Sequence, residues 1–537
     1  MTIIDSRRGD PAETVESDLC IVGGGAAGIT LALDLMDTGL TIAIIESGGE
    51  TFDGSIQALY AGRSIGLENY PLSQSRVRMW GGSTTRWAAQ CRMMERLDFE
   101  RRDWIEDSGW PFDRDSLLPF YARAARTCHL TAFDAIDPER LPEGSFRLDD
   151  EDLRMVRFEF GHPTDFGRAY HERLAKAENV RVHLHTNAIE IVLSDTAGSV
   201  TGIEARTLAG RRLTFRARHY VLAAGGIESP RLMLASRGVA SAGVGNGHDL
   251  VGRYFMDHPY LTTGYFLPAD PALAEGDHVI RTFKRVGWEQ TWHSGMTLSE
   301  AAQRRLGTSG AVAYFIRRLL SETTPDYHYS GNRARNRLRD AWRFRTGSDV
   351  AVARDMALML GGAPDVLRTY AKRALEIVRP RRVLALRTVV ETTPRPDSRV
   401  MLDRATDRLG QPRAMVDWRV SDSDRRGLDH LRRTLARLVR ERGLGELVDD
   451  WSLREHGWPP AMDGGRHHMG TTRMHVDPRR GVVDADAKVH GLANLHIAGS
   501  SIFPTGSYVN PTLTLLALTH RLADRLRSLS TRPAAGP

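Results

Sequence analysis

Close to the N-terminus the spacing of hydrophobic positions changes twice. Residues 19–22, Leu-Cys-Ile-Val, are a short uninterrupted apolar run, which is typical of a strand buried on both faces. After a glycine-rich stretch, residues 29–36 carry apolar side chains at helical spacing, and a second apolar run, Thr-Ile-Ala-Ile-Ile, occupies 41–45. This order predicts a strand–helix–strand unit over residues 17–50.

A second segment with the same order of elements lies near the C-terminus. Residues 494–504, Asn-Leu-His-Ile-Ala-Gly-Ser-Ser-Ile-Phe-Pro, indicate a strand that runs into a Gly/Ser turn. Asn510-Pro511 is a typical helix start, and the apolar residues after it share one helical face. The residues on that face are Leu513, Leu516, Ala517 and Leu522. Two such segments at opposite ends of the chain indicate one nucleotide-binding domain assembled from both ends.

The middle of the chain alternates between strand-like and helix-like patterns. Residues 179–195 alternate as a pair of strands would, and residues 383–403 and 412–420 indicate strands joined by a Pro/Asp turn. Residues 348–382 carry an apolar stripe with basic residues away from it. Such a stripe fits a lid or surface helix, or a helix that docks on a membrane surface or a partner.

Length and composition indicate an ordinary globular protein of two or three domains. The chain has 537 residues, of which 41% are hydrophobic and 26% charged. No apolar run approaches the roughly 20 residues that cross a bilayer, and the N-terminus has no apolar signal-peptide core, so we expect a cytoplasmic protein without a transmembrane segment. The cysteines, Cys20, Cys91 and Cys128, are too scattered for a disulfide framework or a zinc site.

The net charge of +6 is unevenly distributed, because residues 301–390 hold 18 Lys and Arg against 7 Asp and Glu. Such a block could contact nucleic acid, acidic lipid or an anionic substrate, or form a solvated helical face. No nucleic-acid module is visible and aromatic residues are not interleaved with the basic ones, so we expect no nucleic-acid partner.

The glycine-rich stretch after the first strand fits the pattern G-x-G-x-x-G. Gly23 would allow a tight turn, Gly25 would let the backbone approach a pyrophosphate, and Gly28 would let helix and strand pack closely. The helix N-terminus would face the phosphates, and Glu46 at the end of the second strand would accept hydrogen bonds from ribose hydroxyls. These features predict a dinucleotide site but do not separate FAD from NAD.

Four further segments carry a family resemblance. They are RMWGGSTTRWAAQCRM (78–93), YVLAAGGIESPRLMLAS (220–236), DLVGRYFMDHP (249–259) and TTPRPDSRVML (392–402). With these motifs in this order, the sequence resembles the glucose–methanol–choline (GMC) family of flavin oxidoreductases over nearly its whole length. The resemblance implies FAD as the cofactor. It also implies an α/β fold, with a Rossmann-like FAD-binding domain from both chain ends and a substrate domain whose antiparallel sheet, flanked by helices, roofs the flavin.

Within the family, the segments HHMGTTRM and SYVNPTLT resemble most the branch of pyranose oxidases and bacterial sugar and glycoside dehydrogenases. Many members of that branch attach FAD covalently through a histidine in the loop S-T-H-W. Here Arg86 stands at that position. An arginine cannot form that bond, so we expect noncovalent FAD, with Arg86 near the reduced flavin or the substrate.

The resemblance also implies which residues contact the cofactor. They are Gly23, Gly25, Ala26, Ala27, Gly28, Glu46, Ser47, Arg78, Trp80, Gly81, Gly82, Ser83, Thr84, Trp87, Ala188, Ala224, Gly225, Gly499, Ser500, Asn510, Pro511 and Thr512.

The catalytic pair of the family is a histidine in H-x-x-G followed some forty residues later by Asn or His. His467 heads such a motif, and Asn510 follows it. A neutral imidazole suits removal of the hydroxyl proton, and a carboxamide can fix the substrate oxygen. The alternative for His467 is a hydrogen-bonded core histidine.

The remaining histidines near these motifs have weaker signals. His468 either packs against the backbone or contacts the substrate. Adjacent histidine side chains diverge and no carboxylate–histidine cluster accompanies them, so we expect no metal site. His258, which precedes a proline, is interpreted as a turn histidine with an active-site neighbour as the alternative.

These observations predict FAD-dependent oxidation of a CH–OH group, most specifically a ring hydroxyl of a sugar or glycoside. The alternatives are a bulky non-sugar alcohol and a flavoprotein scaffold without turnover. Oxygen, a quinone or a redox protein would accept the electrons, and a homo-oligomer is compatible with the sequence.

The predicted domain organisation alternates between two domains. The FAD-binding domain would comprise residues 14–130, 175–260 and 465–530. The substrate domain would comprise residues 131–174 and 261–464, with a basic helical insertion at 301–382.

Overall fold

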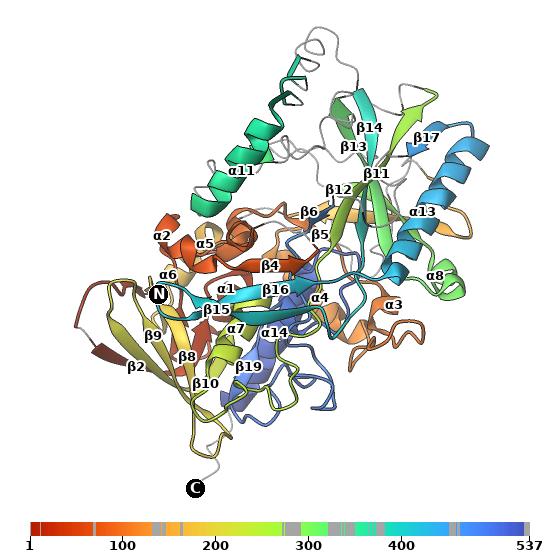
Figure 1. Ribbon diagram of the computed structural model, residues 1–537. Coiled ribbons are helices and arrows are strands. Elements are labelled where there is room, and N and C mark those ends of the chain that lie inside the picture. The colour runs from red at the N-terminus through yellow and green to blue at the C-terminus, as the bar shows by residue number, and fades with distance from the viewer. Residues whose placement is uncertain are drawn as a thin grey trace.

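The computed structural model describes most of the chain. The described ranges are residues 2–10, 12–67, 71–130, 147–161, 165–270, 292–319, 349–364, 382–449 and 462–530, with a few single positions between them. Two large sheets lie at opposite ends of the molecule with a small sheet between them (Figure 1).

The nucleotide sheet contains strands from both ends of the chain. Its order is β1 (Thr2–Asp5), β7 (Val180–Leu184), β3 (Ile42–Ile45), β2 (Ala12–Val22), β10 (Arg212–Leu222), β9 (Val200–Arg206) and β8 (Asn187–Leu193). The pairs from β1 to β10 are parallel, and β8 and β9 add an antiparallel edge. β19 (Leu495–Ile497) pairs parallel with the last residues of β10. The sequence-based expectation of one parallel sheet from both chain ends is confirmed.

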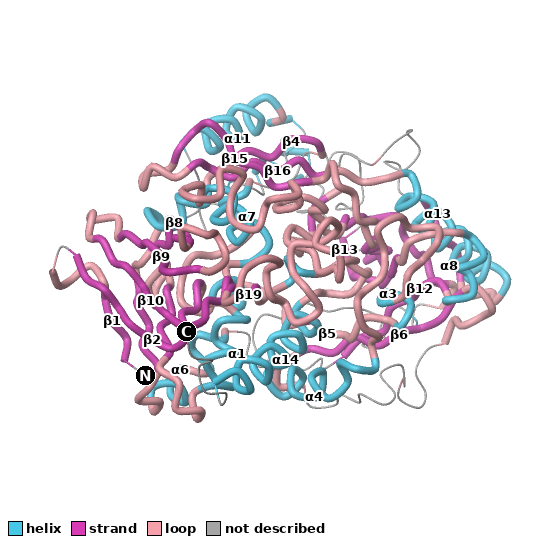
Figure 2. Tube along the Cα trace, turned by 90° about the horizontal axis from the view of Figure 1, so that it is seen from below, coloured by secondary structure: helices cyan, strands magenta, loops and turns pink. Residues whose placement is uncertain are grey.

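Three helices pack side by side next to this sheet. They are α1 (Ala26–Leu35), α14 (Thr512–Ser530) and α4 (Leu118–Thr127). Figure 2 shows them in a row, because α14 packs between the other two. The apolar face expected for α14 is buried, and so are the apolar residues of α1 from Ile29 to Leu35. Helix α7 (Gly225–Ala235) contacts β8 and the small sheet.

The substrate sheet is antiparallel throughout. Its order is β17 (Gly445–Asp449), β11 (Pro259–Pro268), β14 (Arg382–Val390), β13 (Ala311–Leu319), β12 (Trp292–Leu298), β6 (Leu153–Phe160) and β5 (Gln90–Cys91), and β18 (Asp463–Gly464) also pairs with β11. Helix α13 (Asp422–Glu441) begins at a capping box of Ser421 and Asp424 and packs its buried leucines on this sheet. The expected antiparallel sheet with flanking helices is confirmed.

Part of the expected helical insertion at 301–382 is a strand instead. Residues 311–319 form β13, which pairs with β12 and β14. The β-branched and aromatic residues of this segment suit a half-buried strand, and the basic charge that suggested a helical face does not report on pairing. Helices α8 (Glu300–Leu306) and α11 (Asp349–Gly361) lie on either side of β13 in the sequence, while most of 320–348 lies outside the described residues.

Two further expectations differ from the observed strand pairing. The small sheet contains β15 (Arg399–Thr406), β16 (Pro412–Trp418) and β4 (Arg63–Gly66). Since β14 belongs to the substrate sheet, the Pro/Asp segment after it connects two sheets and does not close a hairpin. Likewise β7 and β8, read from 179–195 as a strand pair, are both strands but lie at different places in the nucleotide sheet.

The remaining described helices are single turns or short segments. They are α2 (Gly54–Gln57), α3 (Arg96–Phe99), α5 (Phe166–Ala169) and α6 (His171–Ala175), with 3-10 turns at Ala58–Tyr60, Leu72–Gln74, Gly82–Thr85, Asp115–Leu117 and Ser500–Ile502. Among the described residues, no helix is long and apolar enough to cross a membrane.

Candidate active site

A cavity of about 720 Å³ lies where the nucleotide sheet, the small sheet and the substrate sheet meet. This volume falls within the range of roughly 300–1,000 Å³ that is usual for ligand sites. Its wall combines the glycine turn after β2, the loop at 74–90, the start of α7, the segment 463–468 and the start of α14. Segments from both chain ends therefore enclose one site.

The glycine turn leaves room for a ligand at the start of α1. Gly23 has a φ of +116°, which favours glycine, and its N–H donates to the carbonyl of Ile45 at 2.8 Å. Gly25 is the N-cap residue and supplies no capping side chain, so N–H groups of the first turn remain available. A Cβ at Gly25, Gly225 or Gly499 would meet no atom of the described residues within 4 Å. These cavity-lining glycines form a cradle that fits the diphosphate of a dinucleotide.

Glu46 closes the turn and also lines the cavity. Its two carboxylate oxygens accept the backbone N–H groups of Gly24 and Gly48, each at 2.8 Å. Each oxygen has a further lone pair for a ligand hydroxyl, as the sequence predicts for the ribose. Burial raises the pKa of Glu46 although the two N–H groups favour the ionised form.

Three residues expected to contact the cofactor lie behind the cavity wall. A Cβ on Gly28 would overlap the carbonyl oxygen of Gly23, so Gly28 serves helix packing. Gly81 donates its N–H to Gly24 at 2.9 Å, and the Trp80 indole donates to Gly167 at 3.1 Å. A motif marks both the lining and the supporting residues, and only the structure separates them. All other residues expected to contact the cofactor or the substrate line the cavity.

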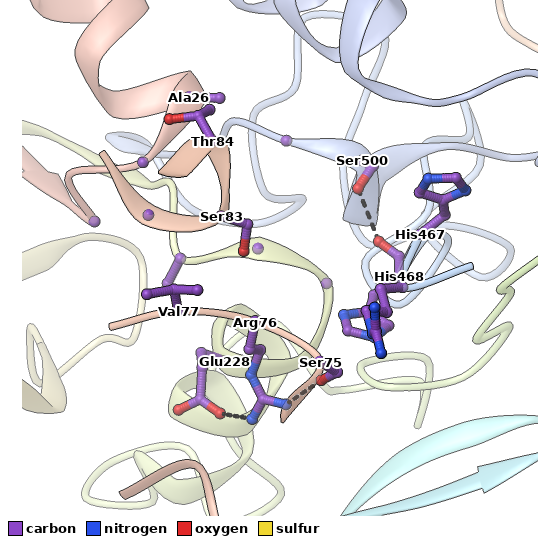
Figure 3. Close-up of a pocket in the computed structure, with 18 of the residues that line it drawn as sticks. Ala26, Ser75, Arg76, Val77, Ser83, Thr84, Glu228, His467, His468 and Ser500 are labelled. Carbon is purple, nitrogen blue, oxygen red and sulfur yellow. Dashed lines mark hydrogen bonds and ion pairs between the residues drawn. The ribbon is translucent and has the colours of Figure 1, made fainter. Parts of the chain in front are cut away.

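An ionic cluster on the cavity wall was not predicted. Glu228 at the start of α7 accepts Arg76 and Arg78, each at 2.6 Å, and Arg231 at 3.0 Å. Although burial alone would raise it, Arg231, Arg76 and Arg78 lower the pKa of Glu228 to about 2. The cluster joins the 74–90 loop to α7 (Figure 3). Glu228 belongs to the motif at 220–236, which was the available signal.

His467 and Asn510 meet on the cavity wall, although 43 residues separate them. The Asn510 Nδ2 lies 3.3 Å from the His467 Nε2, and both residues line the cavity. On the other side of the ring, His467 Nδ1 lies 2.9 Å from Nδ1 of His258. Because His258 is fully buried and contacts His467, the interpretation of His258 as a turn histidine is wrong and the active-site alternative holds.

Hydrogen bonds to the side chain of Asp257 hold the backbone at Arg466 and His467. This buried carboxylate accepts the backbone N–H groups of His467 at 2.8 Å and Arg466 at 3.2 Å. Arg466 has a φ of +61°, an uncommon conformation for a residue with a side chain. Asp257 therefore holds a strained turn that presents the imidazole.

His468 points away from His467, toward Ser75 and Arg76 (Figure 3). Its carbonyl accepts the Ser500 hydroxyl at 2.8 Å, and its ring is buried but lines the cavity. Burial first, and then the charges of Arg76 and Arg466, lower the pKa of His468 to about 3. The two adjacent rings do not converge, and among the described residues no cluster of His, Cys, Asp and Glu could hold a metal.

Side chains of three neighbouring strands form the roof of the cavity, and none of them was predicted. Tyr260 comes from β11, Arg387 from β14, and Tyr314 and Ile316 from β13. The Tyr260 ring lies 6.1 Å from the His467 ring. An arginine within the apolar strand at 383–390 was the available signal.

Comparisons with known proteins agree with this geometry. A model described as FAD dependent oxidoreductase matches residues 18–341, and a model described as GMC oxidoreductase matches residues 394–519. The chain belongs to the FAD-dependent oxidoreductases and, within them, to the GMC oxidoreductase family, whose members act on CH–OH donors. The predictions of FAD as the cofactor and of alcohol oxidation are confirmed.

Individual relatives are distant but cover much of the chain. The 6'''-hydroxyparomomycin C oxidase of Streptomyces lividus is 24% identical over 95% of this chain and 91% of its own length. The fructose dehydrogenase large subunit of Gluconobacter japonicus is 26% identical over 65% of this chain and 55% of its own length. A crystal structure of formate oxidase has a TM-score of 0.56 at 17% identity over 96% of this chain and 99% of that one, which shows the fold alone.

Proposed function

We propose that this enzyme oxidises a ring hydroxyl of a sugar or glycoside, with His467 as the general base. The observation that carries the proposal is the convergence of His467 and Asn510 on the wall of the cavity. The sugar assignment is supported by relatives named for fructose and for hydroxyparomomycin C, an aminoglycoside. FAD, when bound, supplies the acceptor for the hydride of the carbinol carbon.

The contacts of His258 determine which nitrogen of His467 is basic. The carbonyl of Gly506, 3.4 Å from Nε2 of His258, can only accept, so that nitrogen carries the proton. Burial lowers the pKa of His258 to about 4, so the ring is neutral and its Nδ1 is an acceptor. The proton between the two rings then belongs to Nδ1 of His467, and its Nε2 keeps the lone pair that faces Asn510.

A substrate hydroxyl at His467 Nε2 would contact both His467 and Asn510. His467 Nε2 takes the hydroxyl proton, while the Asn510 amide donates to the substrate oxygen. The strained turn above Asp257 holds the ring in place before the substrate arrives. General-base assistance of this kind contributes about 10²- to 10⁴-fold in rate.

We also propose that FAD is held without a covalent bond. Arg86 stands where the resemblance places the attaching histidine, and the glycine cradle, Glu46 and the loop tied to Glu228 supply noncovalent contacts. Acid precipitation of the purified protein should release all of the flavin into the supernatant.

The central test is anaerobic flavin reduction by the variants His467→Ala and Asn510→Ala. We expect His467→Ala to slow bleaching of the flavin by glucose or an aryl glycoside about 10²- to 10⁴-fold while the bound FAD spectrum is kept. Bleaching at the wild-type rate would remove His467 from the mechanism. Bleaching of the wild-type flavin by aliphatic or benzylic alcohols but by no sugar would replace the sugar with another alcohol.

A further inference from the structure

We propose that the physiological substrate carries an anionic group, a carboxylate or a phosphate, which Arg387 binds in the cavity roof. The inference rests on the proposed function, because it takes His467 as the position of the reacting hydroxyl. It specifies that the substrate is negatively charged, and it assigns Arg387 as the residue that determines this specificity.

The strand register places Arg387 on the cavity side of the substrate sheet. Arg387 is opposite Tyr314 on β13 and opposite Thr262 on β11. Directly opposed residues of antiparallel strands point to the same face, so Arg387 shares its face with Tyr314 and, two residues from Thr262, with Tyr260. Its neighbours on the same face of β14 are the apolar Ala385 and Val389. An arginine in this position directs its charge toward the cavity.

Arg387 and His467 both lie near the ring of Tyr260. Its guanidinium carbon lies 5.3 Å from the centre of the Tyr260 ring, and that ring lies 6.1 Å from the ring of His467. The guanidinium is therefore one aromatic side chain away from the base. A substrate the size of a single sugar ring can place a hydroxyl at His467 and a charged substituent at Arg387.

The charges near the base favour an anion. Arg86 and Arg466 line the same cavity, and burial and then the charge of Arg466 lower the pKa of Arg86. Among the described lining residues outside the Glu46 turn and the Glu228 cluster, the acidic ones are Asp463 and Asp407, and Asp407 forms an ion pair with Arg231 at 2.6 Å. Such a wall attracts anionic ligands and disfavours cationic ones.

The geometry of the guanidinium group indicates which anionic groups it binds best. Its planar fork matches the oxygens of a carboxylate or a phosphate and donates two parallel hydrogen bonds. A hydrogen bond to a charged group contributes enough binding energy to change the rate at limiting substrate about 10- to 100-fold. Loss of Arg387 should therefore affect charged substrates selectively.

The experiment compares matched alcohols with and without charge. The FAD-loaded enzyme is mixed anaerobically with one member of three pairs, and flavin bleaching is followed over a range of concentrations. The pairs are methyl glucoside and methyl glucuronide, glucose and glucose 6-phosphate, and 4-methylbenzyl alcohol and 4-(hydroxymethyl)benzoate. The variants are Arg387→Gln and Arg387→Lys. The matched control is Arg404→Gln, since Arg404 is exposed on β15 away from the cavity.

We expect the carboxylate or phosphate member of a pair to reduce the flavin at least about 10-fold more efficiently. Arg387→Gln should lower that efficiency about 10- to 100-fold and change neutral alcohols less than about 3-fold, with Arg387→Lys in between and Arg404→Gln unchanged. The glucuronide and phosphate arms distinguish the two anionic groups.

Other results would separate the two proposals. Equal or better reduction by neutral glycosides, or an equal loss for both members of a pair in Arg387→Gln, overturns the anionic substrate and leaves the sugar proposal in place. Preference for the benzoate alcohol without reduction by any sugar overturns the sugar and keeps the anionic group. Reduction by none of these alcohols overturns both.

Discussion

In our proposal, His258 controls the tautomer of the His467 imidazole without contact to the substrate. It is fully buried, with its Nδ1 at 2.9 Å from Nδ1 of His467 and its Nε2 at 3.4 Å from the carbonyl oxygen of Gly506. Because the carbonyl fixes one proton, His258 fixes the other, and His467 keeps its lone pair on the cavity side. His258 is thus a positioning residue in our proposal.

We predict that His258→Leu lowers the rate of flavin reduction about 10- to 100-fold while FAD remains bound. Without an acceptor behind it, His467 loses the preference for the tautomer with a basic Nε2. In His258→Asn the carboxamide oxygen can accept the proton of His467 Nδ1, so most of the rate should return. The rates and their pH profiles are measured by stopped-flow absorbance.

The pH profile separates positioning from packing. A positioning role requires the apparent pKa of the reduction rate to move in His258→Leu and to return in His258→Asn. Equal losses in both variants with an unchanged pH profile would mean that His258 only fills space.

At the scale of elements, the Glu228 cluster joins a loop to a helix across the cavity wall. Arg76 and Arg78 belong to the loop, and Glu228 and Arg231 belong to α7. All four side chains are at most about a tenth exposed. Removing one partner of a buried ion pair is far more costly than removing an exposed one, because the remaining charges stay buried.

We predict that Glu228→Gln raises the dissociation constant of FAD at least about 10-fold. The amide keeps the shape of the carboxylate but removes the negative charge that pairs with Arg76 and Arg78, while Arg231 keeps its ion pair with Asp407, so the loop should detach from α7. Flavin release is measured by the rise in FAD fluorescence on dilution. The control is Asp115→Asn, which removes an exposed ion pair with Arg96 and should change nothing. Unchanged FAD affinity in Glu228→Gln would show that the loop is held by other contacts.

The helices and strands also show how much of the fold could be predicted from the sequence. Both strand–turn–helix segments were predicted correctly, because continuous apolar strands and glycine turns have strong local signals. β13 was missed because a count of basic residues carries no information about pairing partners. Arg387 was missed because its position in the cavity depends on strand register. His258 was named only as an alternative active-site neighbour, because its contact with His467 joins residues 209 positions apart.

At the scale of the whole molecule, several histidines are buried and neutral. His183 and His496 lie in the nucleotide sheet. His468 lines the cavity, and His258 contacts His467. Burial lowers the pKa of His183 and His258 to about 4 and of His468 and His496 to about 3. In the unfolded chain each would titrate near 6.5. Between these values the unfolded state binds more protons, so stability is complete above pH 6.5 and falls as the pH decreases toward 4. In that window each of these histidines lowers the free energy of unfolding by about 1.4 kcal/mol for each unit by which the pH decreases.

His183 offers a test of this acid sensitivity away from the active site. It lies on β7 against Phe215, and among the described residues neither of its buried ring nitrogens has a hydrogen-bond partner. We predict that His183→Leu is more stable than the parent at pH 5, and that the difference between the two proteins is about 2 kcal/mol larger at pH 5 than at pH 7.5. The free energy of unfolding of the FAD-loaded enzyme is measured in urea at both pH values, with the exposed His248→Gln as the control. A difference that does not change with pH would mean that folding leaves the pKa of His183 unchanged, and the acid sensitivity between pH 6.5 and 4.5 would then have to come from the other buried histidines. Carboxylates such as Glu228 lose their contribution only below about pH 4.5.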